Sequence, residues 1–238
     1  MEQSSLLPAS TVSWIAKSAA PLRRQVLDEL RQSIIAGRLQ PGARLIEREL
    51  ISMMGVSRTV IREALRQLES EGLVAIIPNK GPIVRELTRA EARDLYSIRA
   101  VLEGLAVRLF VENANDSDIR HLDRELEATA EAYSAGDPEQ ILAAKNRFYE
   151  VLSEGAGSET LSSMLNTLHV RIWRWRAVGL THPQRSEKRW KESICGLRAM
   201  LDAIKNRDAF RAESILRDEV TKATAEVMGL LGNVDKTL

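Results

Sequence analysis

Apolar residues near the start of the sequence recur every three or four positions. This spacing predicts a helix over about 22–36 and a short second helix over about 47–54. A third helix is expected after Ser57, whose hydroxyl suits an N-cap position. Its apolar residues at i, i+3, i+4 and i+7 form a stripe that faces a core. The beginning of the chain is therefore predicted to contain three helices joined by short turns.

The period changes after Gly72, a plausible helix C-cap. Residues 73–77 form a β-compatible run, Pro78-Asn79-Lys80-Gly81 is typical of a turn, and residues 83–85 suit a return strand. Three helices and a hairpin predict a compact domain over 21–86. Residues 1–20 offer little to bury and are expected to form a flexible tail.

The rest of the chain shows only helical patterns. Thr88 with Glu91 three residues later has the pattern of a capping box. Turn residues then divide the region into expected helices over 88–114, 117–135, 138–154, 159–180, 185–206 and 209–231. We therefore expect an all-α bundle over 87–233, and a mainly α fold class: an N-terminal winged helix-turn-helix plus a C-terminal all-α helical bundle.

Composition narrows the class of protein. Hydrophobic residues make up 44% of the chain and charged residues 28%, which is ordinary for a globular protein. Cys195 is the only cysteine, so no internal disulfide is possible and a reducing cytoplasm is the expected location. The sequence shows no signal-peptide pattern and no apolar run near the roughly 20 residues of a membrane span.

Charge separates the two predicted domains weakly. The whole chain has a formal net charge of +1, which does not indicate a partner. Residues 21–86 contain 11 Lys and Arg against 8 Asp and Glu, whereas residues 87–238 contain 22 against 24. The first domain is the basic one, and this gives modest support for nucleic-acid binding.

The third predicted helix has the features of a DNA-reading element. A helix, a turn with glycine and a second helix form the helix-turn-helix pattern, which reads DNA with the start of its second helix. Arg58 and Arg62 are four positions apart, opposite the apolar stripe, and arginine can bond guanine through two atoms at once. Ser57 and Thr59 suit a phosphate contact. The alternative is that both arginines simply belong to a solvated helix face.

The segment GRLQPGARLIERELISMMGVSRTVIREALRQLESEGLV, followed by PNKGPIVR, resembles the winged-helix domain of GntR-family regulators. By this resemblance Arg48, Arg58, Thr59 and Arg62 match positions that touch DNA in relatives, with Arg48 the best phosphate contact. Lys80 and Gly81 match the wing tip, which enters the minor groove in relatives.

The second region is similar to the FCD domain of the FadR-like branch of this family. The segments LYSIRAVLEGLAVRL, RFYEVLSEGAGSETL and LDAIKNRDAFRAE carry this resemblance. It implies a helical bundle that binds a small effector, often an organic or sugar acid, and it implies a homodimer.

Many FCD domains hold a divalent metal through an acidic residue or asparagine and three histidines. In this sequence the matching positions are Lys145, Tyr149, Leu197 and Glu219, and none is a histidine. The three histidines present, His121, His169 and His182, lack the spacing of a ligand set. We therefore expect no metal and no other cofactor.

A cationic site is the expected replacement for the metal. Lys145 and Tyr149 lie one helical turn apart and would offer an ammonium and a phenol to an anion. Arg99 and Arg171 are further candidates for effector binding. The alternatives are that Arg99 only pairs with Glu103, that the others lie on the surface, or that the domain only dimerises.

The resulting hypothesis is a sequence-specific transcription regulator. It would bind a near-palindromic double-stranded DNA operator as a homodimer, and a small organic acid in the helical domain would release it, which describes a repressor. The alternative is a regulator whose helical domain only dimerises. An enzyme is not expected, because the sequence lacks a phosphate-binding glycine loop, a zinc-protease motif and a nucleophile elbow.

Overall fold

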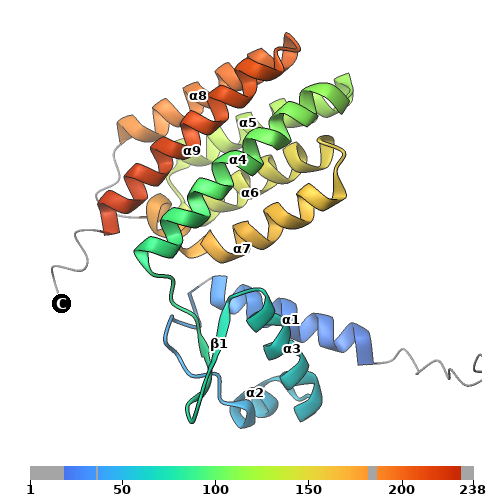
Figure 1. Ribbon diagram of the computed structural model, residues 1–238, viewed down its shortest axis with the longest axis vertical. Coiled ribbons are helices and arrows are strands. Elements are labelled where there is room, and N and C mark those ends of the chain that lie inside the picture. Colours follow the sequence, from blue (N-terminus) through green and yellow to red (C-terminus); the bar gives the residue numbers. More distant parts are fainter. Residues whose placement is uncertain (1–18, 36, 182–186, 232–238) are drawn as a thin grey trace, which may run out of the picture. The chain divides into compact units, whose positions relative to one another are not determined.

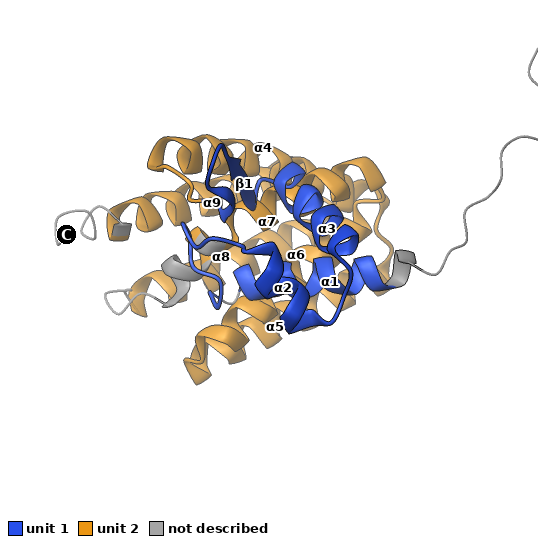
Figure 2. Ribbon diagram, turned by 90° about the horizontal axis from the view of Figure 1, so that it is seen from below, with its two compact units in different colours: residues 1–85 blue, residues 86–238 orange. Residues whose placement is uncertain are grey.

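The computed structural model describes residues 19–35, 37–181 and 187–231. The chain forms two compact units, residues 1–85 and 86–238, which Figure 2 colours separately. The domain boundary expected from the sequence lies one residue later. Most of the tail expected over 1–20 lies outside the described residues, as do His182 and the start of the helix expected at 185.

The first unit contains the three helices and the hairpin that the sequence predicts. Its elements are α1 (Ala19–Ile35), α2 (Glu47–Met54), α3 (Arg58–Ser70), β1 (Val74–Ile77) and β2 (Gly81–Val84) (Figure 1). Helix α1 packs against α3, and α3 packs against β1. Leu30, Ile61 and Leu68 are almost fully buried and belong to the core of this unit.

An ion pair reinforces the packing of α1 against α3. Arg31 donates from Nε and Nη2 to the two carboxylate oxygens of Glu71, at 3.1 and 2.8 Å. Glu71 is the C-cap residue of α3, so the pair joins the C-terminal part of α1 to the end of α3. This contact fixes the orientation of α3 within its unit.

The hairpin differs from the expected return strand over 83–85. Strands β1 and β2 are antiparallel with Ile77 opposite Gly81, so the return strand begins two residues earlier. Asn79 and Gly81 take positive φ angles of 64° and 79°, which turn the chain within three residues. The short extended segment before α2 also pairs with this hairpin, because the N–H of Leu45 donates to the carbonyl of Pro82 at 2.9 Å.

The second unit is helical throughout its described residues. Its elements are α4 (Arg89–Asn113), α5 (Asp116–Ala135), α6 (Pro138–Gly155), α7 (Glu159–Thr181), α8 (Glu187–Lys205) and α9 (Ala209–Leu231) (Figure 1). The predicted capping box begins α4: Thr88 Oγ1 accepts from the N–H of Glu91, and the Glu91 carboxylate accepts from the N–H of Thr88. Within the described ranges, no helix combines the length and apolar character needed to cross a membrane.

Helix α4 lies at the centre of this bundle and packs against α6, α7 and α9. Large side chains such as Phe110, Phe148 and Leu197 are at most 1% exposed. Gly155 faces Phe110 so closely that a Cβ would overlap the ring, which explains the absence of a side chain there. The core thus holds α4, α6, α8 and α9 together, and polar side chains from these helices line a pocket within the bundle.

Candidate functional site

Helix α3 separates its apolar and polar faces completely. Ile61, Ala64 and Leu65 are buried, whereas Arg58, Thr59 and Arg62 are exposed. Ser57 is the N-cap, as expected, and its hydroxyl accepts from the N–H of Val60 at 3.4 Å. The start of α3 therefore presents two guanidinium groups, two hydroxyl groups and free backbone N–H donors to the solvent.

One of these arginines is held by the neighbouring helix. The Nε of Arg62 donates to both carboxylate oxygens of Glu47, each at 3.0 Å. Glu47 is the first residue of α2, and the Arg62 side chain is still 56% exposed. The pair fixes the direction of the Arg62 guanidinium before any ligand arrives. Arg48, the next residue of α2, is exposed as well.

The wing presents the other two candidate residues. Lys80 is exposed at the turn between β1 and β2. Gly81 has a φ of +79°, a conformation that side chains disfavour, and a Cβ at this position would meet no atom within 4 Å. The conformation of the turn thus accounts for the glycine.

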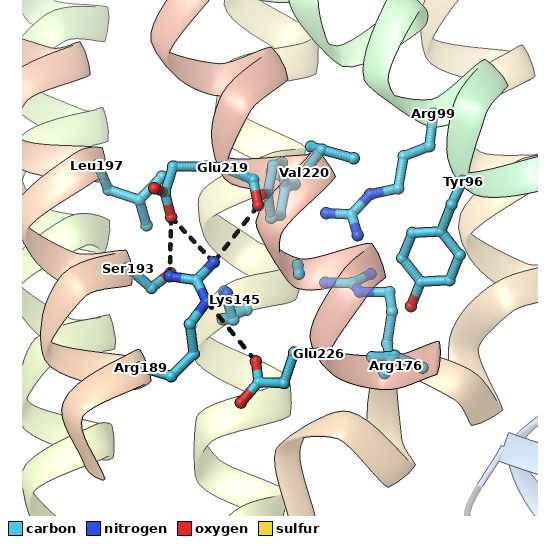
Figure 3. Close-up of a pocket in the computed structure, with 13 residues that line it drawn as sticks. Tyr96, Arg99, Lys145, Arg176, Arg189, Ser193, Leu197, Glu219, Val220 and Glu226 are labelled. Carbon is cyan, nitrogen blue, oxygen red and sulfur yellow. Dashed lines mark hydrogen bonds and ion pairs between the residues drawn. The ribbon is translucent and has the colours of Figure 1, made fainter. Parts of the chain in front are cut away.

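The second unit encloses a pocket lined by side chains from α4, α6, α7, α8 and α9 (Figure 3). The cavity is small: the centre of a water molecule can occupy about 50 Å³ of it. Three of the four candidate effector residues line it, namely Arg99, Lys145 and Tyr149. The structure thus brings together residues from α4 and α6 that lie about fifty positions apart.

Arg171 does not line the pocket. Arg171 and Arg176 are five positions apart on α7, so their side chains point about 140° apart around the helix. Arg176 does line the pocket and is only 7% exposed. The candidate arginine of α7 is therefore Arg176, and the signal that identifies it is its spacing of four from the buried Ile172.

Buried Glu103 neutralises one of the pocket cations. Arg99 Nε donates to Glu103 Oε1 at 2.7 Å, and His169 Nε2 lies 2.7 Å from the same oxygen. Both Arg99 and Glu103 are less than 5% exposed. Although burial opposes ionisation, Arg99 and His169 lower the pKa of Glu103 to about 2. Burial lowers the pKa of His169, so its imidazole is neutral at neutral pH. Arg99 therefore pairs with Glu103 and also lines the pocket, so both roles considered for this residue are present.

Two phenols lie beside these cations. The Tyr149 ring centre is 5.3 Å from the Arg99 guanidinium and 5.6 Å from that of Arg176. Burial raises the pKa of Tyr149 and of Tyr96. Both phenols therefore stay protonated and can donate a hydrogen bond to an anion.

Lys145 and Arg176 differ from Arg99 in their partners. Within the part of the chain that the structure describes, neither forms an ion pair with a carboxylate. Arg176 Nη2 is buried without a hydrogen-bond partner. Burial, followed by the repulsion of neighbouring cations, lowers the pKa of Arg176, and burial also lowers the pKa of Lys145.

The opposite wall of the pocket contains a second polar cluster. Arg189 on α8 donates to Glu219 on α9 at 3.2 Å, and its Nε lies 3.7 Å from Glu226 (Figure 3). Lys222 also donates to Glu219, at 3.1 Å. Leu197, Val220, Ala223 and Val227 supply the apolar part of this wall.

All four positions that match metal ligands in FCD relatives line this one pocket. The residues present do not fit a divalent metal. Lys145 places an ammonium where a carboxylate would be, Tyr149 and Leu197 are not metal ligands of the expected kind, and Glu219 is bonded to Arg189. The described residues contain no group of three or more His, Cys, Asp or Glu that could hold a metal ion.

Trp175 and Trp190 contribute to packing and do not line the pocket. Trp190 stacks on Tyr133 with ring centres 5.6 Å apart, and Trp175 is buried in the bundle core. Neither tryptophan lines the pocket, nor does Trp173.

Comparison with known proteins assigns a family to each unit. Residues 22–84 match the family described as bacterial regulatory proteins, gntR family, and residues 94–221 match the FCD domain. The sequence is 32% identical to the uncharacterized HTH-type transcriptional regulator YdhC of Bacillus subtilis (strain 168), over 70% of this chain and 75% of that protein. It is 28% identical to a probable D-xylose utilization operon transcriptional repressor of Paenarthrobacter nicotinovorans, over 89% and 91% of the two chains.

A solved structure extends the match to three dimensions. The Escherichia coli protein McbR/YncC superposes with a TM-score of 0.72 at 29% identity, over 87% of this chain and 96% of that chain. The sequence and structural matches agree for both units. The chain is therefore a member of the GntR family of DNA-binding transcription regulators, with a winged helix-turn-helix domain followed by an FCD domain.

Proposed function

We propose that this regulator is a repressor that a small organic acid releases from DNA. The observation that carries the proposal is the buried cationic pocket, where Lys145 and Arg176 have no carboxylate partner among the described residues. A buried charge without a partner destabilises a fold, so such a pocket favours a domain that binds an anion over one that only dimerises.

In this proposal the first domain contacts the operator through exposed residues. Arg58 and Arg62 bond base edges in the major groove, since their side chains lie at the start of α3. Ser57, Thr59 and Arg48 contact phosphates. Lys80 and Gly81 enter the minor groove at the tip of the wing.

A homodimer would use the exposed apolar stripe of α4. Ile98 and Val101 are 50% and 51% exposed, and Leu105 follows four positions later on the same face. Met164 on the neighbouring α7 is 55% exposed. Exposed apolar side chains at helical spacing are typical of an interface, and a two-fold dimer matches a near-palindromic operator.

Repression is the proposed sign of regulation. It requires only that the bound protein block a promoter, and one relative bears the name of a repressor. Release follows if the acid binds the state of the protein that cannot hold DNA more tightly than the state that can. The acid would bind directly to Lys145, Arg176 and the two phenols, without a metal.

The test begins with selection of an operator from a random DNA pool by the full-length protein. Fluorescence anisotropy then measures operator affinity while a panel of organic acids is added, and thermal unfolding reports binding of each acid. The proposal expects at least one acid that both stabilises the protein and weakens operator binding. Metal analysis of protein purified without chelator should find no stoichiometric metal.

Absence of any stabilising acid would contradict the proposal and favour the alternative in which the FCD domain only dimerises. A stabilising acid that leaves operator affinity unchanged would also contradict release as the mechanism. Lys145→Met should abolish the response to the acid while operator binding persists, and Lys188→Met, on the exposed surface of α8, is the matched control.

A further inference from the structure

The charges that meet in the pocket do not balance. Arg99 lowers the pKa of both Lys145 and Arg176, so these three cations lie close together, and Glu103 is the described carboxylate that bonds one of them. Glu103 already bonds Arg99, and His169 is neutral. This cluster therefore has two positive charges in excess of its negative charge.

The opposite wall does not supply the missing negative charge. Glu219 accepts from Arg189 and from Lys222, and Glu226 lies beside Arg189. Each of these carboxylates thus has a cationic partner from its own wall: Arg189 lies in the pocket, and Lys222 lies at its edge with a side chain that is 58% exposed. Neither carboxylate forms an ion pair with Lys145 or Arg176 among the described residues.

Burial makes this imbalance costly. Arg176 is 7% exposed, and its Nη2 lacks a hydrogen-bond partner while the side chain points toward Arg99 and Tyr96 (Figure 3). A cation that leaves water without a counter-ion destabilises a fold. The same cations become favourable when an anion enters between them.

We propose that the pocket binds a small dianion, with its two negative charges neutralised by Lys145 and Arg176. This inference rests on the proposed effector function and specifies the class of effector. The free space is small, so a molecule of a few heavy atoms fits, either a short dicarboxylate or a phosphate monoester. The protonated phenols of Tyr96 and Tyr149 donate to its oxygens, and the apolar side chains of α9 contact its carbon atoms.

Matched pairs of probes test the number of charges. Succinate against monomethyl succinate, and methyl phosphate against dimethyl phosphate, differ mainly in one negative charge. Isothermal titration calorimetry of the full-length protein, in chelator and at slightly alkaline pH, gives each affinity. At least one dianion should bind about tenfold or more tightly than its monoanionic partner. The pair that shows the difference distinguishes a dicarboxylate from a phosphate.

Two variants assign the charges to residues. Lys145→Met and Arg176→Met should each reduce the dianion-to-monoanion affinity ratio to about one, and Lys188→Met should preserve the ratio. Equal binding within both probe pairs, or a ratio that persists in both variants, would overturn the inference. If a monoanionic acid binds well and releases the operator, the effector function survives and only the dianion is wrong. If no acid or phosphate binds, both fail.

The melting temperature of the ligand-free protein provides an independent readout. Lys145→Met and Arg176→Met should each raise it by a few degrees, because each removes a pocket charge that forms no ion pair with a carboxylate among the described residues. Arg99→Met should lower it, since it leaves Glu103 without its partner. A lower melting temperature for both Lys145→Met and Arg176→Met would show that the free protein neutralises these cations, and would overturn the inference.

Discussion

The two domains of this regulator use cations in opposite environments. On the winged helix, Arg58, Arg62 and Arg48 are exposed, and Arg62 shares its charge with Glu47 at the surface. In the FCD domain, Arg99 and Arg176 are buried, and Lys145 lines the same pocket. Exposed cations cost little to keep and interact with the phosphates of any DNA, whereas buried cations require a particular partner.

The difference in burial predicts a difference in salt dependence between DNA binding and anion binding. Salt screens exposed charges within about 10 Å at 0.1 M, so contacts from the winged helix respond strongly to ionic strength. Charges in a small buried pocket are screened much less. Under the two proposals, exposed arginines of the winged helix would bind a long polyanion, and cations in the FCD pocket would bind a small anion.

The largest effect is expected when the buried ion pair of Arg99 and Glu103 is removed. Glu103→Ala removes the partner of Arg99 and should lower the free energy of unfolding of the FCD domain by about 3–5 kcal/mol, because a buried charge loses its counter-ion. Chemical denaturation followed by circular dichroism measures this change.

Glu127→Ala is the matched control, since its carboxylate pairs with Arg198 where both side chains are 52% exposed. It should change the free energy of unfolding by less than about 1 kcal/mol. Similar losses for the two variants would mean that the Arg99–Glu103 pair behaves as a surface pair.

The second effect concerns the exposed side. Arg58→Ala or Arg62→Ala should each weaken binding to the selected operator by about 1–3 kcal/mol and relax the preference at one base position. Anisotropy titrations with the operator and single-base variants measure both. Arg38→Ala, which removes an exposed arginine paired with Glu29 on α1, should leave specificity unchanged. Undiminished operator binding by both recognition-helix variants would remove α3 from the interface.

Acidification provides the third test. The pKa of Glu103 is about 2 in the folded protein, below its ordinary value, so its charge stabilises the fold above that ordinary value. This stabilisation is lost as pH falls from about 4.5 toward 2. The stability difference between the natural chain and Glu103→Gln should therefore shrink over this range. Denaturation at several pH values measures it, and a constant difference would disagree with an ionised Glu103.

The smallest effect lies where the exposed pair orients a DNA contact. Glu47→Gln should change stability by less than about 1 kcal/mol, since the pair is solvated. It removes a negative charge close to the phosphates and frees Arg62, so affinity for random DNA should rise slightly while the preference for the operator falls. Competition titrations measure this ratio. An unchanged ratio would show that Glu47 does not position Arg62.

Much of the fold could be predicted from local patterns. The helix boundaries follow from apolar spacing and from turn residues such as Gly55 and Gly136, which take positive φ angles after their helices. The wing strand was misplaced by two residues, because its start depends on hydrogen bonds across the hairpin rather than on the residues themselves. Such pairing is not visible in one strand alone.

The candidate sites divide in the same way. The candidate DNA-contact residues lie at the start of α2, at the start of α3 with its cap, and at the turn of the wing, so a local motif is enough to predict them. The pocket joins five helices, and its residues span α4 to α9. The sequence pattern indicates Arg171 rather than Arg176 or Arg189, because the face of a helix that borders a cavity depends on the neighbouring helices.

The order of the elements and the winged helix follow from patterns along the chain, whereas the replacement of metal ligands at Lys145, Tyr149, Leu197 and Glu219 is an expectation from the family resemblance. The packing of the helices places these positions around one pocket, and among the described residues it pairs Glu103 with Arg99 but not with Lys145 or Arg176. The reason is physical. Local propensity depends on neighbours in the chain, whereas the state of a buried charge depends on which distant side chains the fold places beside it.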